Sequence, residues 1–300
     1  MSRTIVETTI TRRSALSGGV ACVLGFVVPR RLFSSLISQG TSEAMAGGRI
    51  SRSMAPNLYA FPGAGHNTTA IAVTWREQAL DARCDPGQYS KVRIHAGLNT
   101  WEFDLSNQAP TKLQRSDDIS VFTGNVVAPL GVNDALVKAV AMELPARAIA
   151  QGGSAGIWAE HYKRGLRRRI GTPFLSHLVA ENESLAAIYH SSTPAEDRDM
   201  LMKPLAAAIA DRFRGMSADA DAISHGRRLA SALLPDVLRY DSDRPTGFTF
   251  AAQNGRHPSE STDEMVSAFL NGGAPSAIVV RSARQTLETF PYFRQMAAAV

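Results

Sequence analysis

Hydrophobic and polar positions alternate with a period of two over much of the chain between Asn57 and about Arg169. Successive side chains of a strand point to opposite faces, so this period predicts strands with one buried face. The expected strands cover residues 71–75, 92–95, 101–105, 119–122, 136–144 and 156–162. Residues 96–99 form a short turn signal between two of them and predict a hairpin. Connections this short leave little room for crossover helices, so antiparallel pairing in a sandwich or barrel is expected.

The period changes to that of a helix after about Phe174. Thr193, followed by Pro194 and Glu196, forms a capping box with proline at the first helical position. A second helix is expected between Ser217 and Pro235, and a third, short helix is capped at residues 261–264. The side chains expected to face inward from the first two helices are Leu201, Leu205, Ile209, Ile223, Ala230, Leu233 and Leu234.

These patterns predict a β-rich α+β fold, with an antiparallel β-sandwich-like core and a helical segment packed on it in the C-terminal half. Residues 47–300 are expected to form a single domain. Within that domain, residues 55–170 are mainly β, residues 193–234 form a helical insertion, and residues 235–300 complete the same unit.

Composition excludes several classes of protein. A chain of 300 residues with 44% hydrophobic and 20% charged residues is not expected to be disordered. Two cysteines exclude a disulfide scaffold and a four-thiolate zinc site. The net charge of +5 falls mainly on the first 46 residues, since the remainder holds 27 basic and 25 acidic residues. A nearly neutral body offers no field for nucleic acid, which is therefore not an expected partner.

The N-terminal segment has the features of an export signal. Arg12 and Arg13 precede a weakly apolar stretch at residues 16–28, as in twin-arginine signals. Ala44 and Ala46 supply the small-x-small pattern of a signal peptidase site, so cleavage after Ala46 is expected. Residues 1–46 are thus interpreted as a twin-arginine-type signal peptide, and the mature chain as periplasmic or extracellular. No apolar run is long enough for a stable membrane span after signal removal.

The segment 152–156 (GGSAG) matches the Gly-x-Ser-x-Gly pattern of serine hydrolases. Ser154 followed by Asp236 or Asp241, and then by His257, has the chain order of such a catalytic triad. The expected context is the reverse of a nucleophile elbow, because a helical turn precedes the motif and a strand follows it. A loop without catalytic function is therefore the preferred interpretation, and a serine hydrolase is the alternative.

Other chemistry is not indicated by the sequence. The seven histidines are scattered without helical metal-ligand spacing, so no metal site is predicted, and no glycine-rich loop indicates a phosphate cofactor. No cofactor of any kind is expected. The basic run at residues 163–169 (KRGLRRR) is interpreted as a solvated hairpin tip, because interleaved aromatic residues are missing.

An ordered set of short motifs resembles the bacterial domain of unknown function 4331 family. The motifs lie at residues 57–61 (NLYAF), 121–124, 142–145, 156–159 and 234–240, with Asn254, Gly255, Arg256 and Asp263. The resemblance spans about residues 55–292 and implies an exported, β-rich protein with an embedded helical part and no assigned biochemical role. Asn57 stands where the family usually has an acidic residue, and the paired acids after Arg256 are reduced to Asp263 and Glu264.

The resulting expectation is an exported protein that acts as a non-enzymatic binding or cell-envelope module. Its partner would be a small ligand or an envelope protein. The predicted binding residues are Asn254, Arg256 and Asp263. Asn-Gly favours a tight turn, which would bring Arg256 to the first turn of the following helix near Asp263. A structural clasp between Arg256 and Asp263 is the preferred interpretation of this pair, and a ligand or ion site at the same place is the alternative. An intracellular structural role is the further alternative if the N-terminus is not a signal.

Overall fold

Two antiparallel sheets dominate the computed structural model, which confirms the predicted β-rich α+β fold with sandwich-like packing. The structure describes residues 56–75, 90–105, 112–115, 118–127, 136–149, 154–163, 166–214, 222–244, 247–248, 253–261, 266, 280–281 and 286–295. The first sheet has the order β1(Asn57–Pro62), β2(Thr68–Trp75), β7(Leu136–Pro145), β6(Ser120–Val127), β5(Lys112–Arg115).

The second sheet has the order β10(Leu238–Asp241), β8(Ser154–Lys163), β3(Ser90–Ala96), β4(Asn99–Asp104). Strand β9(Leu166–Ile170) pairs with the later half of β8, beside the part that pairs with β10. Two short two-stranded pairs follow, β11(Gly247–Phe248) with β12(Gln253–Asn254) and β13(Glu260–Ser261) with β14(Val280–Arg281). The predicted hairpin joins β3 to β4, and Gly97 at its turn has a φ of 58°.

The main core lies between the inward faces of the two sheets. Ile71 and Val140 of the first sheet and Ile94 and Ile157 of the second are all fully buried in one hydrophobic cluster. Their neighbours in sequence face the other way, as the period of two requires. The outer face of the first sheet is covered as well, because Tyr292 and Phe293 pack there in a second cluster with Tyr59.

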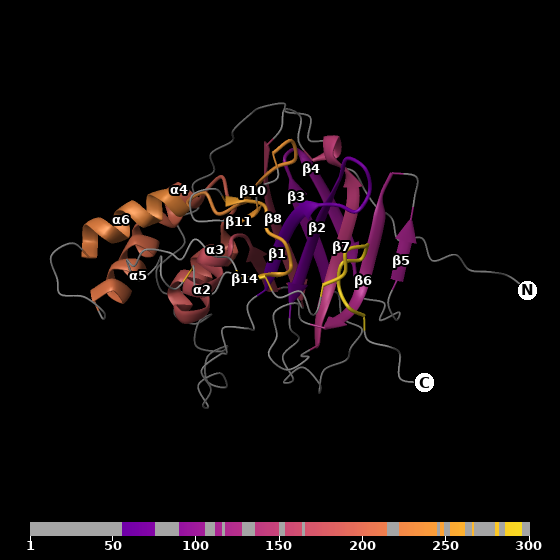
Figure 1. Ribbon diagram of the computed structural model, residues 1–300. Coiled ribbons are helices and arrows are strands. Elements are labelled where there is room, and N and C mark those ends of the chain that lie inside the picture. Colours follow the sequence, from indigo (N-terminus) through magenta and orange to yellow (C-terminus); the bar gives the residue numbers. More distant parts are fainter. Residues whose placement is uncertain are drawn as a thin grey trace, which may run out of the picture.

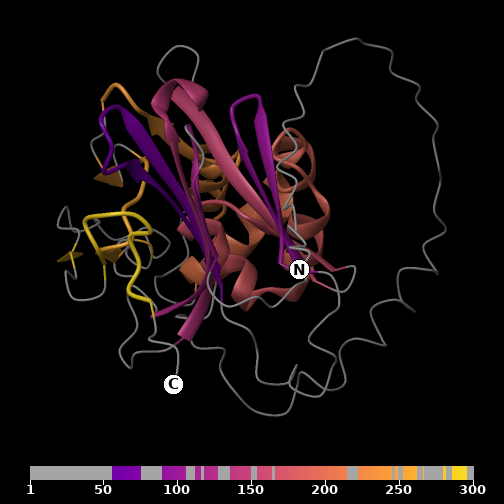
Figure 2. The ribbon, with the colours of Figure 1, turned by 90° about the vertical axis from the view of Figure 1, so that its right-hand side faces the viewer.

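The α-helices of the described residues lie together on one side of the two sheets, next to β10 and β8 of the second (Figure 1). Viewed from the β5 side, the sheets stand in front of the helices (Figure 2). Leu178, Leu205 and Leu229 extend the main core into the helical part. The helices are α2(Pro173–Glu181), α3(Glu183–Ser191), α4(Asp197–Met200), α5(Met202–Arg214) and α6(Ala222–Leu233).

The helical part differs from its prediction in two respects. It begins at Pro173 and not at residue 193, because two helices, α2 and α3, precede the predicted start. Pro173 stands at the first turn of α2, and Asn182 caps α3 by accepting a hydrogen bond from the Leu185 amide at 2.9 Å. Ile223 is 57% exposed and does not face inward, because the buried face of α6 starts at Ala222 and continues through His225 and Leu229.

Only half of the predicted capping box forms: the Glu196 carboxylate accepts hydrogen bonds from the amide and the hydroxyl of Thr193 at 2.8 Å. The Glu196 amide binds the Thr193 carbonyl and not its hydroxyl, and α4 begins at Asp197 with Glu196 as its N-cap. Within the described part of the chain, none of the helices combines the length and apolar character that crossing a membrane requires.

Candidate functional site

Charged and aromatic side chains gather on the outer face of the second sheet. In β3, Val92 and Ile94 point into the core, so Lys91, Arg93 and His95 lie on the opposite face. Strand register then sets Arg93 opposite Glu160 of β8, and Glu160 opposite Arg169 of β9. We call this surface the polar face; it consists of Lys91, Arg93, His95, Thr100, Glu102, Trp158, Glu160, Tyr162 and Arg167.

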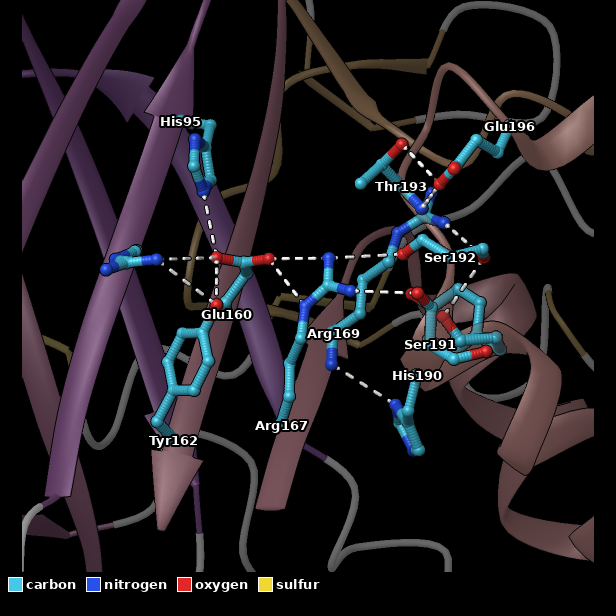
Figure 3. A network of polar contacts seen from close by, with 12 residues as sticks. His95, Glu160, Tyr162, Arg167, Arg169, His190, Ser191, Ser192, Thr193 and Glu196 are labelled. Atoms are coloured by element: carbon cyan, nitrogen blue, oxygen red, sulfur yellow. Dashed lines mark hydrogen bonds and ion pairs between the residues drawn. The ribbon is translucent and has the colours of Figure 1, made fainter. Parts of the chain in front are cut away.

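Glu160 is the central acceptor of the polar face (Figure 3). Its Oε2 atom accepts a hydrogen bond from the Tyr162 hydroxyl at 2.8 Å and lies 3.3 Å from Nε2 of His95. Its Oε1 atom accepts from Nε of Arg167 at 2.6 Å, and Nη1 of Arg93 lies 4.0 Å from Oε2. The Glu160 side chain is only 6% exposed, so its charge is compensated almost entirely by these neighbours.

The environment keeps Glu160 ionised. Burial by itself raises the pKa of the Glu160 carboxyl, but the hydrogen bonds from His95 and Tyr162 and the charge of Arg167 outweigh burial and lower the pKa to about 2. A carboxylate with so low a pKa is a weak proton acceptor at neutral pH. Glu160 is therefore suited to holding its cationic neighbours in place and poorly suited to acid–base catalysis.

The rim of the polar face remains accessible. Lys91, Arg93 and Glu102 have side chains that are 36%, 35% and 40% exposed, and Glu102 pairs with both basic groups. Both cations contact the ring of Tyr162, whose centroid lies 5.4 Å from Nζ of Lys91 and 5.1 Å from Cζ of Arg93. The rim thus presents ordered cationic and aromatic groups to solvent.

Aromatic stacking orders the side chains of His95 and Trp158 on the polar face. The rings of His95 and Trp158 are stacked with centroids 4.0 Å apart and an interplanar angle of 9°. The Arg169 guanidinium lies 5.7 Å from the Trp158 ring centroid. His95 is also held at its second ring nitrogen, because Nδ1 lies 2.9 Å from the Thr100 hydroxyl.

A second, fully buried network joins the sheet to the helices. Arg169 of β9 pairs with the Asp197 carboxylate, with Nη2 2.6 Å from Oδ2, and also donates to the backbone carbonyl of Asp236 at 3.0 Å. The Asp236 carboxylate accepts hydrogen bonds from the Thr172 amide at 2.9 Å and from the Tyr189 hydroxyl at 2.6 Å. Burial raises the pKa of the Asp236 carboxyl, and the charge of Arg169 only partly offsets that effect.

Arg167 connects the polar face to the helical part. Besides binding Glu160, its guanidinium donates to the carbonyls of Ser191 and Ser192 at 3.1 and 3.2 Å, at the end of α3. A cation is favourable there because the last carbonyls of a helix carry partial negative charge. The interpretation of residues 163–169 as a solvated tip is therefore wrong for Arg169, which is buried at the sheet–helix junction.

The proposed triad residues lie in separate settings. Ser154 is exposed and begins β8, opposite Asp241 of β10 in the strand register. Asp236 is buried and uses both carboxylate oxygens in bonds to Thr172 and Tyr189. Nδ1 of His257 lies 2.6 Å from the Ser259 hydroxyl, and the His257 ring meets Phe61 edge-on. In the described residues, Ser154 thus belongs to a regular strand and not to a turn between strand and helix.

The predicted binding residues form part of the link between β12 and β1. Asn254 accepts a hydrogen bond from the Asp241 amide at 2.6 Å and donates to the Arg244 carbonyl. Gly255 has a φ of 71°, as expected for the Asn-Gly turn, and Arg256 is buried against β1. The predicted positions Arg12, Arg13, Ala44, Ala46, Gly152, Gly153 and Asp263 lie outside the described residues.

The Glu160 network was not predicted from the sequence. The signal for it was present in the alternation of Lys91, Arg93 and His95 with apolar residues, and of Glu160 and Tyr162 with buried ones. Only the register between β3, β8 and β9, however, brings these residues together. Among the described residues, no group of three or more His, Cys, Asp or Glu side chains is arranged to hold a metal ion.

Comparisons of the chain with protein-family models, with curated proteins and with solved structures found no match. The resemblance to the domain of unknown function 4331 family therefore stays a prediction.

Proposed function

We propose that the protein is an exported, non-enzymatic binding or cell-envelope module, and that the polar face is its binding surface. The observation that carries this proposal is the Glu160 network, in which one buried carboxylate orders basic and aromatic groups whose outer rim is open to solvent. Groups that are fixed before binding lose little conformational entropy on binding, which favours recognition.

Two further observations support a binding role over catalysis. The pKa of Glu160, lowered to about 2, makes this residue a poor general base. Asp236, the first acid considered for a Ser154 triad, is committed to Thr172 and Tyr189. The segment at residues 1–46 has the features of a twin-arginine signal peptide and supports export by the twin-arginine route.

Export is tested by sequencing the N-terminus of protein recovered from the periplasmic and envelope fractions of its native host. A chain beginning after Ala46 is expected. Recovery from the cytosol alone, beginning at Met1, would contradict export and favour an intracellular structural protein.

The binding surface is tested by co-sedimentation of the purified mature protein with isolated cell envelopes. Arg93→Glu is expected to reduce the bound fraction several-fold, and binding by the parent protein is expected to weaken as salt is added. Lys203→Glu, an exposed reversal of the same size on α5, is the matched control and should bind like the parent. Equal binding by all three proteins would rule out the polar face as the contact surface.

A further inference from the structure

Arg256 is buried on the outer face of the first sheet, away from the polar face. Its backbone bridges to β1, donating from its amide to the Ala60 carbonyl at 2.7 Å and accepting from the Ala60 amide at 3.1 Å. Gly255 makes this approach possible, because a Cβ atom at that position would lie 2.4 Å from the Ala60 carbonyl oxygen. Arg256 is 2% exposed, and its guanidinium lies 4.9 Å from the centre of the Tyr59 ring.

The charge of Arg256 is incompletely compensated. Nη1 donates to Oδ1 of Asn57 at 2.9 Å, which is a neutral acceptor, and Nε has no hydrogen-bond partner. Within the described ranges, no carboxylate forms an ion pair with this guanidinium. An arginine keeps its charge in proteins, and buried charges are normally paired because desolvation is costly.

Arg169 provides an internal comparison. It is buried to the same degree, 2% exposed, and its Nε is also unpaired, but its two terminal nitrogens bind the Asp197 carboxylate. The arrangement around Arg169 therefore contains an anion that none of the described residues supplies to Arg256. The difference between these two buried arginines indicates a position for an anion beside Arg256.

The acid of the same described segment, Glu260, has a different hydrogen-bond partner. The Glu260 carboxylate accepts a hydrogen bond from the His257 amide at 3.0 Å and closes the turn that follows Arg256. Asn57 contributes a side chain to Arg256 from β1, and the Tyr59 ring lies under the guanidinium within cation–π distance. A planar guanidinium held in this way matches the two oxygens of a carboxylate or a phosphate group.

We propose that Arg256, with Asn57 and Tyr59, forms a binding site for the oxyanion of a small carboxylate or phosphate ligand. This site lies on the outer face of the first sheet and does not depend on the polar face of the second. The anion satisfies the buried guanidinium, and Asn57 and Tyr59 set the direction from which it is bound. The alternative partner of Arg256 is an anion from the protein itself, for which the Asp263 carboxylate is the candidate.

The test is thermal unfolding of the mature protein in increasing concentrations of sodium phosphate or sodium acetate, with sodium chloride at matched ionic strength as the reference. A saturable rise in Tm with phosphate or with acetate, absent in chloride, is expected, since a ligand that binds only the folded state stabilises it. The oxyanion that gives the rise identifies the ligand as a phosphate or a carboxylate. Arg256→Gln should abolish the rise.

Arg239→Gln is the matched control, because Arg239 is an exposed arginine of β10 whose carbonyl binds the Gly255 amide at 2.6 Å. It should keep the full response to the oxyanion. Asn57→Ala removes the neutral partner of Arg256 and should move the midpoint of the response to a several-fold higher concentration. That variant keeps the proposal testable if Arg256→Gln does not fold.

Asp263→Asn separates an external from an internal anion. An unchanged or stronger response to the oxyanion in this variant is the expected result. Two results would overturn the proposal and make Arg256 a structural residue. One is a parent protein whose Tm responds to neither phosphate nor acetate, and the other is an Asp263→Asn variant whose Tm falls as much as that of Arg256→Gln. Because none of these variants touches the polar face, failure here leaves the envelope-binding measurements unaffected.

Discussion

Arg169 and Asp197 form an ion pair with two parallel hydrogen bonds, and neither side chain is exposed to solvent. The pair joins β9 of the second sheet to α4 and holds the helical part against the sandwich. Its geometry meets the conditions under which a buried ion pair is tolerated, since Ser192 and the carbonyl of Asp236 accept further hydrogen bonds from the same guanidinium.

Removing one member of this pair should be strongly destabilising. Asp197→Asn leaves the Arg169 cation buried without its counter-charge, and we expect a loss of about 3–5 kcal/mol in the free energy of unfolding. Asp211→Asn is the control, because Asp211 pairs with Arg214 at 2.6 Å on the exposed surface of α5 and should cost less than about 1 kcal/mol. Urea denaturation measures both; similar losses would contradict the structural importance of the buried pair.

Glu160→Gln should also reduce stability more than a matched change at the rim. The substitution removes the charge that compensates Arg167 and its neighbours, and we expect a cost of about 2 kcal/mol at neutral pH. Glu102→Gln, at a carboxylate that is 40% exposed, should cost less than about 1 kcal/mol. Because the folded pKa of Glu160 is lowered from 4.5 to about 2, its contribution is present above pH 4.5 and is lost as the pH falls toward 2. Glu160→Gln should flatten the stability curve in that window.

His190 should make stability depend on pH in a higher range. Burial and the charges of the arginines at 167–169 lower the pKa of His190 from 6.5 to about 4, and its Nδ1 accepts a hydrogen bond from the Arg169 amide. Between these values the unfolded chain binds a proton that the folded chain does not, so the free energy of unfolding should fall as the pH drops from 6.5 to 4, on the order of 2 kcal/mol. His190→Asn retains an acceptor and should remove this dependence. A parallel pH profile for parent and variant would show that another group titrates there.

Gly226→Ala should destabilise the protein although alanine is the better helix former. In an isolated helix this change gains about 1 kcal/mol. Here the new Cβ would lie 2.2 Å from the Ala206 carbonyl oxygen and 3.1 Å from Cβ of Ala210, so α5 and α6 must separate. We expect a net loss of about 1–3 kcal/mol. Ser231→Ala, on the exposed side of α6, should be nearly neutral, and a stabilised Gly226→Ala would show that the two helices can move apart at little cost.

Ser154 should not react as an activated nucleophile. It is exposed in a regular strand, and Asp236 is bonded to Thr172 and Tyr189 instead of to a catalytic histidine. A fluorophosphonate probe, which labels activated serines, is expected to leave the protein unlabelled. Labelling that is abolished by Ser154→Ala and retained by Ser259→Ala would instead support the serine hydrolase alternative.

Local patterns were sufficient to predict most of the sheet framework. The alternation at residues 92–95 and 101–105 predicted β3 and β4, because one face of each strand packs on the core. The contact between Thr193 and Glu196 was predicted because it spans only three residues, although the helix begins later than the predicted capping box requires. Ile223 was misassigned because helical spacing does not reveal where the buried face of a helix begins.

The candidate sites depend on contacts that no local pattern contains. Arg169 lies in a basic run that is typical of a surface, yet its partners Asp197 and Asp236 are 28 and 67 residues further along the chain. Arg256 meets Asn57 from 199 residues away. Burial of an arginine follows from such long-range contacts, so residue type and spacing alone assigned Arg169 to a solvated tip and did not predict that Arg256 contacts Asn57.

The three consecutive arginines of β9 have a consequence for how the chain assembles. A slip of one residue between β8 and β9 would exchange Arg168 for Arg167 or Arg169 without changing the type of side chain presented. The arginines therefore do not select the register of this hairpin by themselves. Ile170, which enters the core from β9 itself, and Asp197, which receives Arg169 from α4, select it instead. Which of the three arginines is buried at the sheet–helix junction is thus decided by its surroundings in the core and in α4, and not by its own residue type.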